Sequence, residues 1–342
     1  MFKKLISKYN KPFFIAEISA NHNGSIKLAK KLIQISKKSG ADAVKLQTYE
    51  PVDITLNSKE SFFKINKSIW GSDNLWDLYK RAQTPLSWHK ELFNYSKKIG
   101  ILCFSSPFSV RAVNYLEQLK CPIYKIASFE ANHFQLLKRI AETKKPIIIS
   151  TGLSSIRDLE ESINFLKKNK SGKIHLLYCV SKYPSKISDF NFSNIKILKK
   201  KFKLTIGFSD HSTNDIVAYS AVAYGAEIIE KHIAIDKESI DGKFSKDIFQ
   251  LKSFIQSLKT IPLLKNNSKK YSLPKKNINK KFKRSIFTID NIKKNTKICK
   301  ENIAAIRPAN GINAKYYFKV IGKIAKKNIK KNTPLKFSDL KI

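Results

Sequence analysis

The chain has 342 residues, of which 42% are hydrophobic and 11% aromatic, so it can bury a large core and is not a disordered protein. Its 66 Lys and Arg residues against 26 Asp and Glu give a formal charge of +40, which suits polyanions or small anionic substrates. The lysines are spread along the chain together with many Asn and Ile residues, and all three amino acids have A/T-rich codons, so genome composition can explain much of the charge. Because no RNA-binding signature accompanies the lysines, we expect no nucleic-acid partner.

The cysteines and the first residues bear on the compartment. Cys103, Cys121, Cys179 and Cys299 show no C-x-x-C spacing and lie mostly in apolar runs, as reduced core cysteines do. No apolar run reaches membrane-spanning length, and Met1–Lys4 lead into the chain without the apolar region of a signal peptide. We therefore expect a soluble cytoplasmic protein that has no membrane partner.

Short apolar runs alternate with amphipathic segments from residue 13 onward. Eight runs are β-branched and almost continuously apolar, as strands buried on both faces are: 13–19, 43–49, 101–106, 123–128, 146–151, 173–180, 204–210 and 227–234. Helical spacing predicts helices over 25–39, 86–99, 109–119, 132–143, 155–168, 213–224 and 247–260, and less regularly over 192–201. This pattern predicts a (β/α)8 TIM barrel over residues 1–262. An open doubly wound sheet is the alternative, but no G-x-G-x-x-G follows the first strand.

Residues 52–85 interrupt the second β/α unit and contain Trp70, Trp76 and Tyr79. An insertion of this length after a strand is often a lid or a wall of a substrate pocket. A packing or interface flap is an equally good interpretation.

The pattern changes after Pro262. Residues 263–283 are polar and lysine-rich, which predicts a linker. In the remaining segment, 284–342, the six residues Asn291–Thr296 recur as Asn328–Thr333. This repeat predicts a small β-rich domain with internal pseudo-symmetry.

Two histidines end two neighbouring predicted strands. His211 follows Ser209 and Asp210, and His232 comes 21 positions later at the end of EIIEKH. Because parallel strands end at the same rim of a barrel, two imidazoles and a carboxylate could converge there and hold a divalent metal ion. Packing or hydrogen bonding of each histidine at its strand end is the plainer alternative.

The other predicted strands also end in polar side chains, and these are Glu17, Lys45, Gln47, Ser105, Ser106, Lys125, Ser128, Ser150, Thr151, Ser181, Tyr183 and Lys231. Lys45 and Lys125 each lie in an otherwise apolar strand, and charged groups are seldom buried without a partner. Two lysines among several hydroxyl groups predict a pocket for a small, multiply anionic ligand. A Schiff-base aldolase would also place a lysine inside its barrel and remains an alternative.

In this order, several phrases resemble the sialic acid synthase family: IAEISANHNGS, ADAVKLQTY, FSSPF, YKIASFEAN, STG, GFSDHS and IEKH. The family condenses phosphoenolpyruvate (PEP) with an amino sugar to form a nonulosonic acid. The resemblance includes AAIRPANG, which is similar to the family's C-terminal antifreeze-like (SAF) domain, here 284–342. WGSDNLWDLYKRAQTPLSWH, ILCFSSPF, YKIASFEAN and DGKFSKD resemble the branch that forms pseudaminic acid from 2,4-diacetamido-2,4,6-trideoxy-L-altrose. N-acetylneuraminate or legionaminate formation is the alternative within the family.

The resemblance implies a role for each matching residue. His211 and His232 are expected to bind the metal, usually Mn²⁺, with Mg²⁺ or Co²⁺ possible. Residues expected to bind the carboxylate and phosphate of PEP are Lys45, Ser106, Lys125, Ser128, Ser150, Ser181 and Ser209. Glu17 is expected to hold the reacting water, and the residues expected to face the sugar are Gln47, Tyr183 and Asp241. Arg307 is expected to reach the sugar in a neighbouring subunit's barrel, which implies a domain-swapped homodimer.

Three positions depart from the family pattern. Ser181 stands where the sialic branch of the family often has Asn, and the helix start after His211 lacks its usual Gly. SIDGKFS also differs from the common phrase around Asp241, so the role of Asp241 rests on a weaker match than the roles of the histidines.

Overall fold

The computed structural model describes residues 11–65, 70, 74–264 and 278–341. It divides the chain into two compact units, Met1–Asn266 and Asn267–Ile342, so the N-terminal unit ends close to the predicted barrel boundary at residue 262. Residues 265–277 of the expected linker 263–283 lie outside the described residues. No helix among the described residues is long and apolar enough to cross a membrane.

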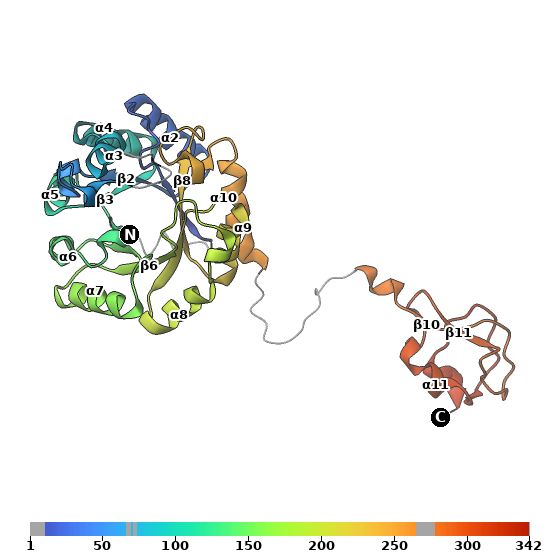
Figure 1. Cartoon of the computed structure of the whole chain (residues 1–342). Helices are drawn as coiled ribbons and strands as arrows, with labels where there is room; N and C mark the ends of the chain where they lie inside the picture. The colour runs from blue at the N-terminus through green and yellow to red at the C-terminus, as the bar shows by residue number, and fades with distance from the viewer. Residues whose placement is uncertain (1–10, 66–69, 71–73, 265–277, 342) are drawn as a thin grey trace. The chain divides into compact units, whose positions relative to one another are not determined.

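Eight parallel strands close the N-terminal unit into a barrel (Figure 1). They are β1 (Phe13–Glu17), β2 (Ala43–Thr48), β3 (Leu102–Pro107), β4 (Tyr124–Ile126), β5 (Ile147–Ser150), β6 (Ile174–Cys179), β7 (Thr205–Asp210) and β8 (Ile228–Ala234). Each strand pairs with the next in chain order, β8 also pairs with β1, and β9 (Lys246–Asp247) extends β8. The predicted TIM barrel is confirmed, and the open-sheet alternative is wrong.

The helices form a ring outside the strands (Figure 1). They are α2 (Ile26–Lys38), α4 (Leu86–Ile99), α5 (Val110–Gln118), α6 (Phe134–Glu142), α7 (Ile156–Lys168), α8 (Ser193–Phe202), α9 (Asp215–Tyr224) and α10 (Leu251–Thr260). Serine side chains cap three of them, since Ser25 accepts from Leu28 N, Ser109 from Ala112 N and Ser155 from Asp158 N. Each helix covers the strands with its apolar face, so every strand residue from Phe13 to Glu17 and from Ile228 to Ala234 is buried.

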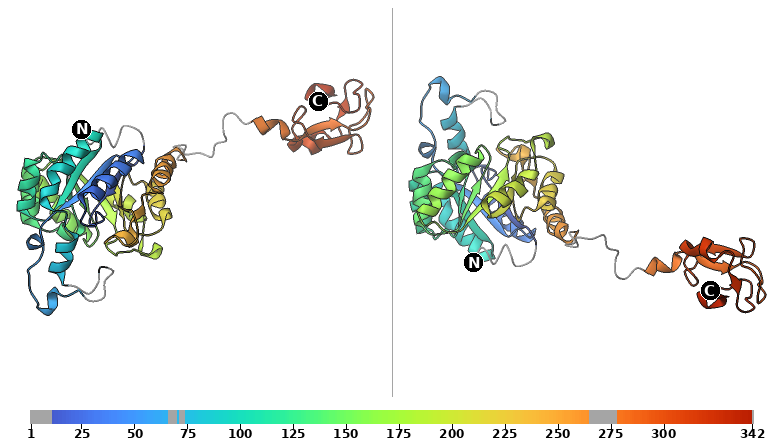
Figure 2. Two further views of the ribbon diagram at one scale, coloured as in Figure 1. Left: turned by 90° about the horizontal axis from the view of Figure 1, so that it is seen from above. Right: turned by 90° about the horizontal axis from the view of Figure 1, so that it is seen from below.

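The insertion after β2 stands out from one end of the barrel (Figure 2). Its described elements are η1 (Pro51–Asp53), η2 (Ser61–Phe63) and α3 (Leu75–Ala82). Because it follows the C-terminal end of β2, this end is the one at which TIM-barrel enzymes build their active sites.

Four barrel helices end at a lysine with left-handed backbone. Lys120, Lys144, Lys170 and Lys203 follow α5, α6, α7 and α8 with φ between 53° and 58°. Glycine is usual at this position because a Cβ atom is strained there, whereas α4 ends in the ordinary way at Gly100 with φ 72°.

The C-terminal unit has its own core, which includes Ile286, Ile298 and Leu335. Its strands are β10 (Ser285–Thr288), β11 (Ile303–Ile306), β12 (Ile324–Ala325) and β13 (Leu340–Lys341), with one short helix, α11 (Tyr317–Val320). The two copies of the repeat pair with each other. Asn291 Oδ1 accepts from Lys331 N at 2.9 Å, and Asn328 Oδ1 accepts from Lys294 N at 2.7 Å. The predicted pseudo-symmetric β-rich domain is confirmed.

Candidate active site

Four charged side chains from β1, β2, β4 and β8 meet inside the barrel. Glu17 Oε2 lies 2.5 Å from Lys45 Nζ, and Lys125 Nζ donates to Glu230 Oε1 at 2.9 Å. Lys45 Nζ is also 3.7 Å from Glu230 Oε2, which links the two pairs. All four residues are at most 4% exposed, and charges buried so deeply require partners of this kind.

The pKa values of this cluster follow from burial and pairing. Burial alone would raise the pKa of Glu230, but Lys125 and Lys45 outweigh it and lower the pKa to about 2. Burial would lower the pKa of Lys45, but Glu17 and Glu230 outweigh it and raise the pKa above its ordinary value. Burial raises the pKa of Glu17 against the opposing charge of Lys45. Lys45 and Glu230 are therefore charged at neutral pH, with their charges already partnered.

The predicted serines surround this cluster. Lys45 Nζ lies 3.4 Å from Ser106 Oγ, Ser209 Oγ donates to Glu230 Oε1 at 3.0 Å, and Ser128 Oγ lies 2.8 Å from Ser181 Oγ. Ser150 Oγ is buried and has no hydrogen-bond partner among the described residues. Contacts therefore join four of the seven residues expected at PEP, namely Lys45, Ser106, Lys125 and Ser209, through the charged cluster. Ser128 and Ser181 form a separate pair, and the unpartnered Ser150 hydroxyl can bond to a ligand.

Gly152 makes the approach of two of these serines possible. A Cβ atom at Gly152 would collide with Ser181 Oγ and would lie 2.5 Å from Ser128 Cβ. Only glycine leaves room for the Ser128–Ser181 contact at this point of the barrel rim.

The two histidines lie beside each other with their ring centroids 5.6 Å apart. His211 Nδ1 lies 3.0 Å from Val180 O, so Nδ1 carries the proton and Nε2 is unprotonated, with Ser209 Oγ 3.5 Å away. Burial, followed by the nearby His232, lowers the pKa of His211 to about 3, which keeps the imidazole in its neutral, metal-binding form. His232 Nδ1 lies 3.5 Å from Asp241 Oδ2.

His211 and His232 fit a metal site in which the protein supplies only part of the ligands. Among the described residues, no three His, Cys, Asp or Glu side chains form a ready metal-binding cluster. Water and substrate oxygens would have to supply the remaining ligands, which is usual for a catalytic rather than a structural metal.

The expectation that Asp210 converges with the histidines is wrong. Asp210 Oδ2 accepts from Lys231 Nζ at 2.8 Å, and Asp210 Oδ1 accepts from Ser212 N. Successive strand residues point to opposite faces, so Asp210 and Lys231 turn away from the interior that Ser209 and Glu230 face. The carboxylate beside His232 is Asp241.

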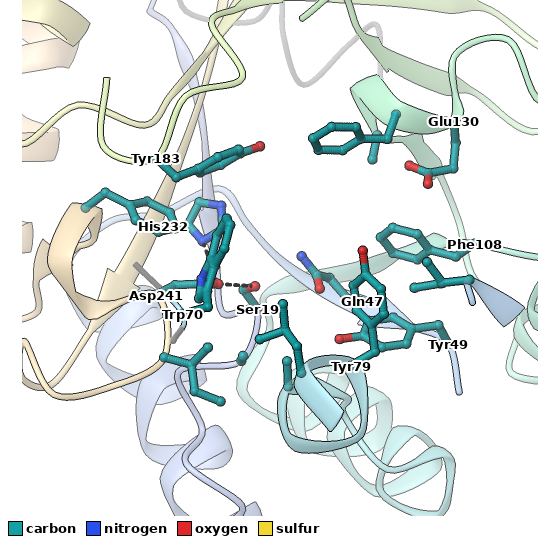
Figure 3. A pocket seen from close by; sticks show the side chains of 18 residues that line it. Ser19, Gln47, Tyr49, Trp70, Tyr79, Phe108, Glu130, Tyr183, His232 and Asp241 are labelled. Carbon is teal, nitrogen blue, oxygen red and sulfur yellow. Dashed lines mark hydrogen bonds and ion pairs between the residues drawn. The ribbon is translucent and has the colours of Figure 1, made fainter. Parts of the chain in front are cut away.

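A cavity of about 330 Å³ opens beside His232 (Figure 3). Its lining includes four residues expected from the sequence, and these are Gln47, Tyr183, His232 and Asp241. Trp70 from the insertion donates through Nε1 to Asp241 Oδ1 at 3.0 Å, and its ring lies 5.5 Å from that of Tyr183. Ser19 Oγ donates to Asp241 Oδ2 at 2.6 Å. Trp70 and Ser19 thus fix the Asp241 carboxylate at the cavity wall.

Sequence reasoning missed several residues of this site. Glu230 had a signal, because it lies two positions before His232 and so shares its face of the strand. Ser19 and Glu130 lie beyond strand ends, where no periodicity places a side chain. The insertion 52–85 was expected as a lid or pocket wall, and its Trp70 and Tyr79 do line the cavity. Arg307 is exposed on the C-terminal unit, and its expected contact with the sugar stays a prediction.

Comparison with known proteins decides the family. The NeuB family model matches residues 32–270. The chain belongs to the NeuB family. The SAF domain model matches residues 283–341, almost the same range as the predicted domain at 284–342. The resemblance inferred from the sequence motifs is therefore confirmed.

Several NeuB-family relatives match over most of their length. The chain is 41% identical to a pseudaminic acid synthase of Helicobacter pylori, covering 96% of this chain and 98% of that one. It is 37% identical to an N,N'-diacetyllegionaminic acid synthase of Campylobacter jejuni, covering 94% and 98%. Among solved structures, an N-acetylneuraminic acid synthetase of Leptospira borgpetersenii in complex with citrate is 33% identical with a TM-score of 0.69. That match covers 77% of this chain and 88% of that chain.

Proposed function

We propose that this protein is a pseudaminic acid synthase, which condenses PEP and water with 2,4-diacetamido-2,4,6-trideoxy-L-altrose and releases phosphate. The observation that carries the proposal is the pair of buried lysines, Lys45 and Lys125, ringed by serines next to two histidines. Full-length similarity to a relative named pseudaminic acid synthase supports the choice of sugar. Formation of N-acetylneuraminate or legionaminate is the alternative.

In this proposal the chain's own residues would bind PEP. Lys45 and Lys125 would hold the PEP anion, and the unpartnered Ser150 hydroxyl would donate to it. Since both lysines already pair with Glu17 and Glu230, the ligand's oxygens would share these cations with the carboxylates. Part of this attraction acts on bound PEP before it reacts, so it contributes to affinity as well as to rate.

The proposed reaction forms one C–C bond and breaks one C–O bond. C3 of PEP attacks the aldehyde carbon C1 of the open-chain sugar, and the aldehyde oxygen takes up a proton to become a hydroxyl. Water adds to C2 of PEP, with Glu17 placed to accept its proton, and the adduct collapses to a ketone as phosphate leaves with the bridging oxygen. Water thus supplies the oxygen at C2, one proton to the new hydroxyl and one to phosphate.

We also propose a divalent metal ion, most simply Mn²⁺, on His211 and His232. The neutral state of His211 and its unprotonated Nε2, which has only the Ser209 hydroxyl 3.5 Å away, support this assignment. A metal bound there would act as a Lewis acid toward the aldehyde oxygen. A His211→Ala protein should lose bound metal and turnover together, and turnover that is independent of metal in this variant would contradict the assignment.

The experiment that tests the proposed function is phosphate release from PEP by manganese-loaded protein. It is run in parallel with the altrose-configured sugar and with N-acetylmannosamine. Release with the altrose sugar alone would establish pseudaminic acid synthesis, and release with N-acetylmannosamine alone would move the enzyme to the sialic branch. Borohydride in the presence of PEP should trap no adduct, whereas a lysine adduct would favour a Schiff-base aldolase.

The domain-swapped homodimer is part of the same proposal. Arg307 is exposed on the C-terminal unit, which also exposes Phe318 and Phe337, and such apolar groups suit contact with another surface. If Arg307 acts in the partner's barrel, mixing Arg307→Ala protein with His211→Ala protein should restore activity in the hybrid dimers. No recovery after subunit exchange would show that both residues serve one subunit.

A further inference from the structure

The end of the cavity away from the histidines differs in character from the end beside them. Figure 3 shows Glu130, Phe108, Tyr49 and Tyr79 grouped on the side opposite His232 and Asp241. Leu78 and Ala82, one helical turn apart on α3, also line the cavity. This end therefore combines one carboxyl group with a mainly apolar surface.

Glu130 brings an acceptor that the protein does not use. Its Oε2 is buried and has no hydrogen-bond partner among the described residues. Burial raises the pKa of Glu130 to about 7, while a hydrogen bond from its own backbone N–H and the charge of Lys125 act in the opposite direction. A buried acceptor without a donor costs free energy, so a donor on a bound ligand would gain more here than at the surface.

The surface around Glu130 limits which donor suits it. The rings of Tyr49, Tyr79 and Phe108 pack edge to face, with centroids 5.8 Å apart for Tyr49–Tyr79 and 5.1 Å for Tyr49–Phe108. A hydroxyl group would satisfy the acceptor but leave this apolar surface uncovered. An N–H group next to a methyl group would satisfy the acceptor and also bury apolar area.

We propose that this end of the cavity binds a second acylamino substituent of the sugar. The Glu130 carboxyl accepts the amide N–H, and the α3 face formed by Leu78 and Ala82 packs against the acyl methyl group. The inference rests on the proposed function, because the aldehyde carbon must lie at the histidine end. Substituents farther along the sugar, such as the acetamido group at C4, then lie at the Glu130 end.

The acceptor is tested with the diacetamido sugar and an analogue that has hydrogen in place of the C4 acetamido group. Glu130→Met removes the acceptor at similar size, and Glu130→Gln keeps an acceptor oxygen. We expect Glu130→Met to lower kcat/KM for the diacetamido sugar by about 10- to 100-fold and to leave the 4-deoxy analogue unchanged, with Glu130→Gln recovering most of the loss. Equal losses for both sugars would overturn the proposal.

The apolar wall is tested by filling it. Ala82→Leu should lower kcat/KM for the diacetamido sugar about 10-fold more than for a 4-hydroxy analogue, because only the larger substituent needs the space. Lys80→Ala, on the exposed side of the same helix, is the matched control and should change neither value. Wild-type protein that uses the 4-hydroxy analogue as well as the diacetamido sugar would overturn the proposal.

Calorimetric titration of each sugar into protein without PEP separates this inference from the proposed function. If wild-type protein releases no phosphate with either sugar, the proposed function fails, and the two Kd values still decide the subsite. Tighter binding of the diacetamido sugar, lost in Glu130→Met, supports the subsite, whereas equal Kd values for both sugars overturn it.

Discussion

Replacing Glu130 by glutamine should stabilise the barrel. The effect should begin at the pH at which the Glu130 carboxyl group of the unfolded chain ionises, near 4.5. The pKa of Glu130 is raised from 4.5 to about 7, mainly by burial. The native state therefore holds the proton up to about pH 7, while the unfolded chain releases it near pH 4.5. Between these two pH values proton release lowers the free energy of the unfolded state but not that of the native state. The free energy of unfolding of wild-type protein therefore falls as the pH rises.

The magnitude follows from the shift of about 2.5 pH units. At about 1.36 kcal/mol per unit, ionisation of Glu130 costs the native state about 3 kcal/mol. Glutamine has no such ionisation. The difference in unfolding free energy between Glu130→Gln and wild-type protein should therefore grow by about 3 kcal/mol between pH 4.5 and pH 8.

Tryptophan fluorescence during urea unfolding can measure this difference. All three tryptophans, Trp70, Trp76 and Trp88, belong to the barrel, so the signal does not report on the C-terminal unit. Glu142→Gln, at an exposed position on α6, is the matched control and should stay within about 0.5 kcal/mol of wild-type protein. A difference between Glu130→Gln and wild type that does not change with pH would refute the burial of this carboxyl group.

Three further predictions concern the site itself. Lys125→Met should raise the KM for PEP by about 10- to 100-fold, because it removes a charge-assisted contact with PEP. Lys138→Met, at an exposed position, is the control, and an unchanged KM in Lys125→Met would contradict the assignment. Trp70→Phe should lower kcat/KM for the sugar about 10-fold, because it removes the hydrogen bond from Trp70 Nε1 to Asp241, and it should leave the KM for PEP unchanged. Trp76→Phe is the control, and an equal effect on PEP would point to a general loss of structure. Gly152→Ala should push Ser181 and Ser128 apart, so we expect weaker PEP binding and a loss of about 1–3 kcal/mol in stability. Wild-type values for both would show that the backbone at the barrel rim can move to accommodate the methyl group.

The sequence predicted the barrel well because its signals are periodic. Residues 13–17 and 147–150 are buried strands, and both lie within continuous apolar runs bounded by polar residues. Strand-end positions also follow from topology, since parallel strands end at one rim. This is why the sequence alone predicts that Lys45, Lys125 and the two histidines belong to one site.

The errors and omissions have physical reasons. Asp210 was placed with the histidines although strand alternation turns it away from Ser209, and the same alternation would have identified Glu230. Trp70 reaches Asp241 across 171 positions from an insertion, and no periodic signal fixes the path of such a segment. Glu130 follows β4 in a 3-10 turn, so its aim into the cavity depends on tertiary packing.

Four lysines with left-handed backbone follow barrel helices, and their positions help to explain why the chain carries a charge of +40. A side chain in this conformation costs about 1 kcal/mol relative to glycine, and Lys120, Lys144, Lys170 and Lys203 all carry that cost. All four lysines lie between a helix and the next strand, so they share the end of the barrel opposite the candidate active site. A bias toward A/T-rich codons accounts for lysine at positions where the backbone favours glycine. Replacing the four lysines by glycine would remove charge and strain together at the end of the barrel opposite the candidate active site.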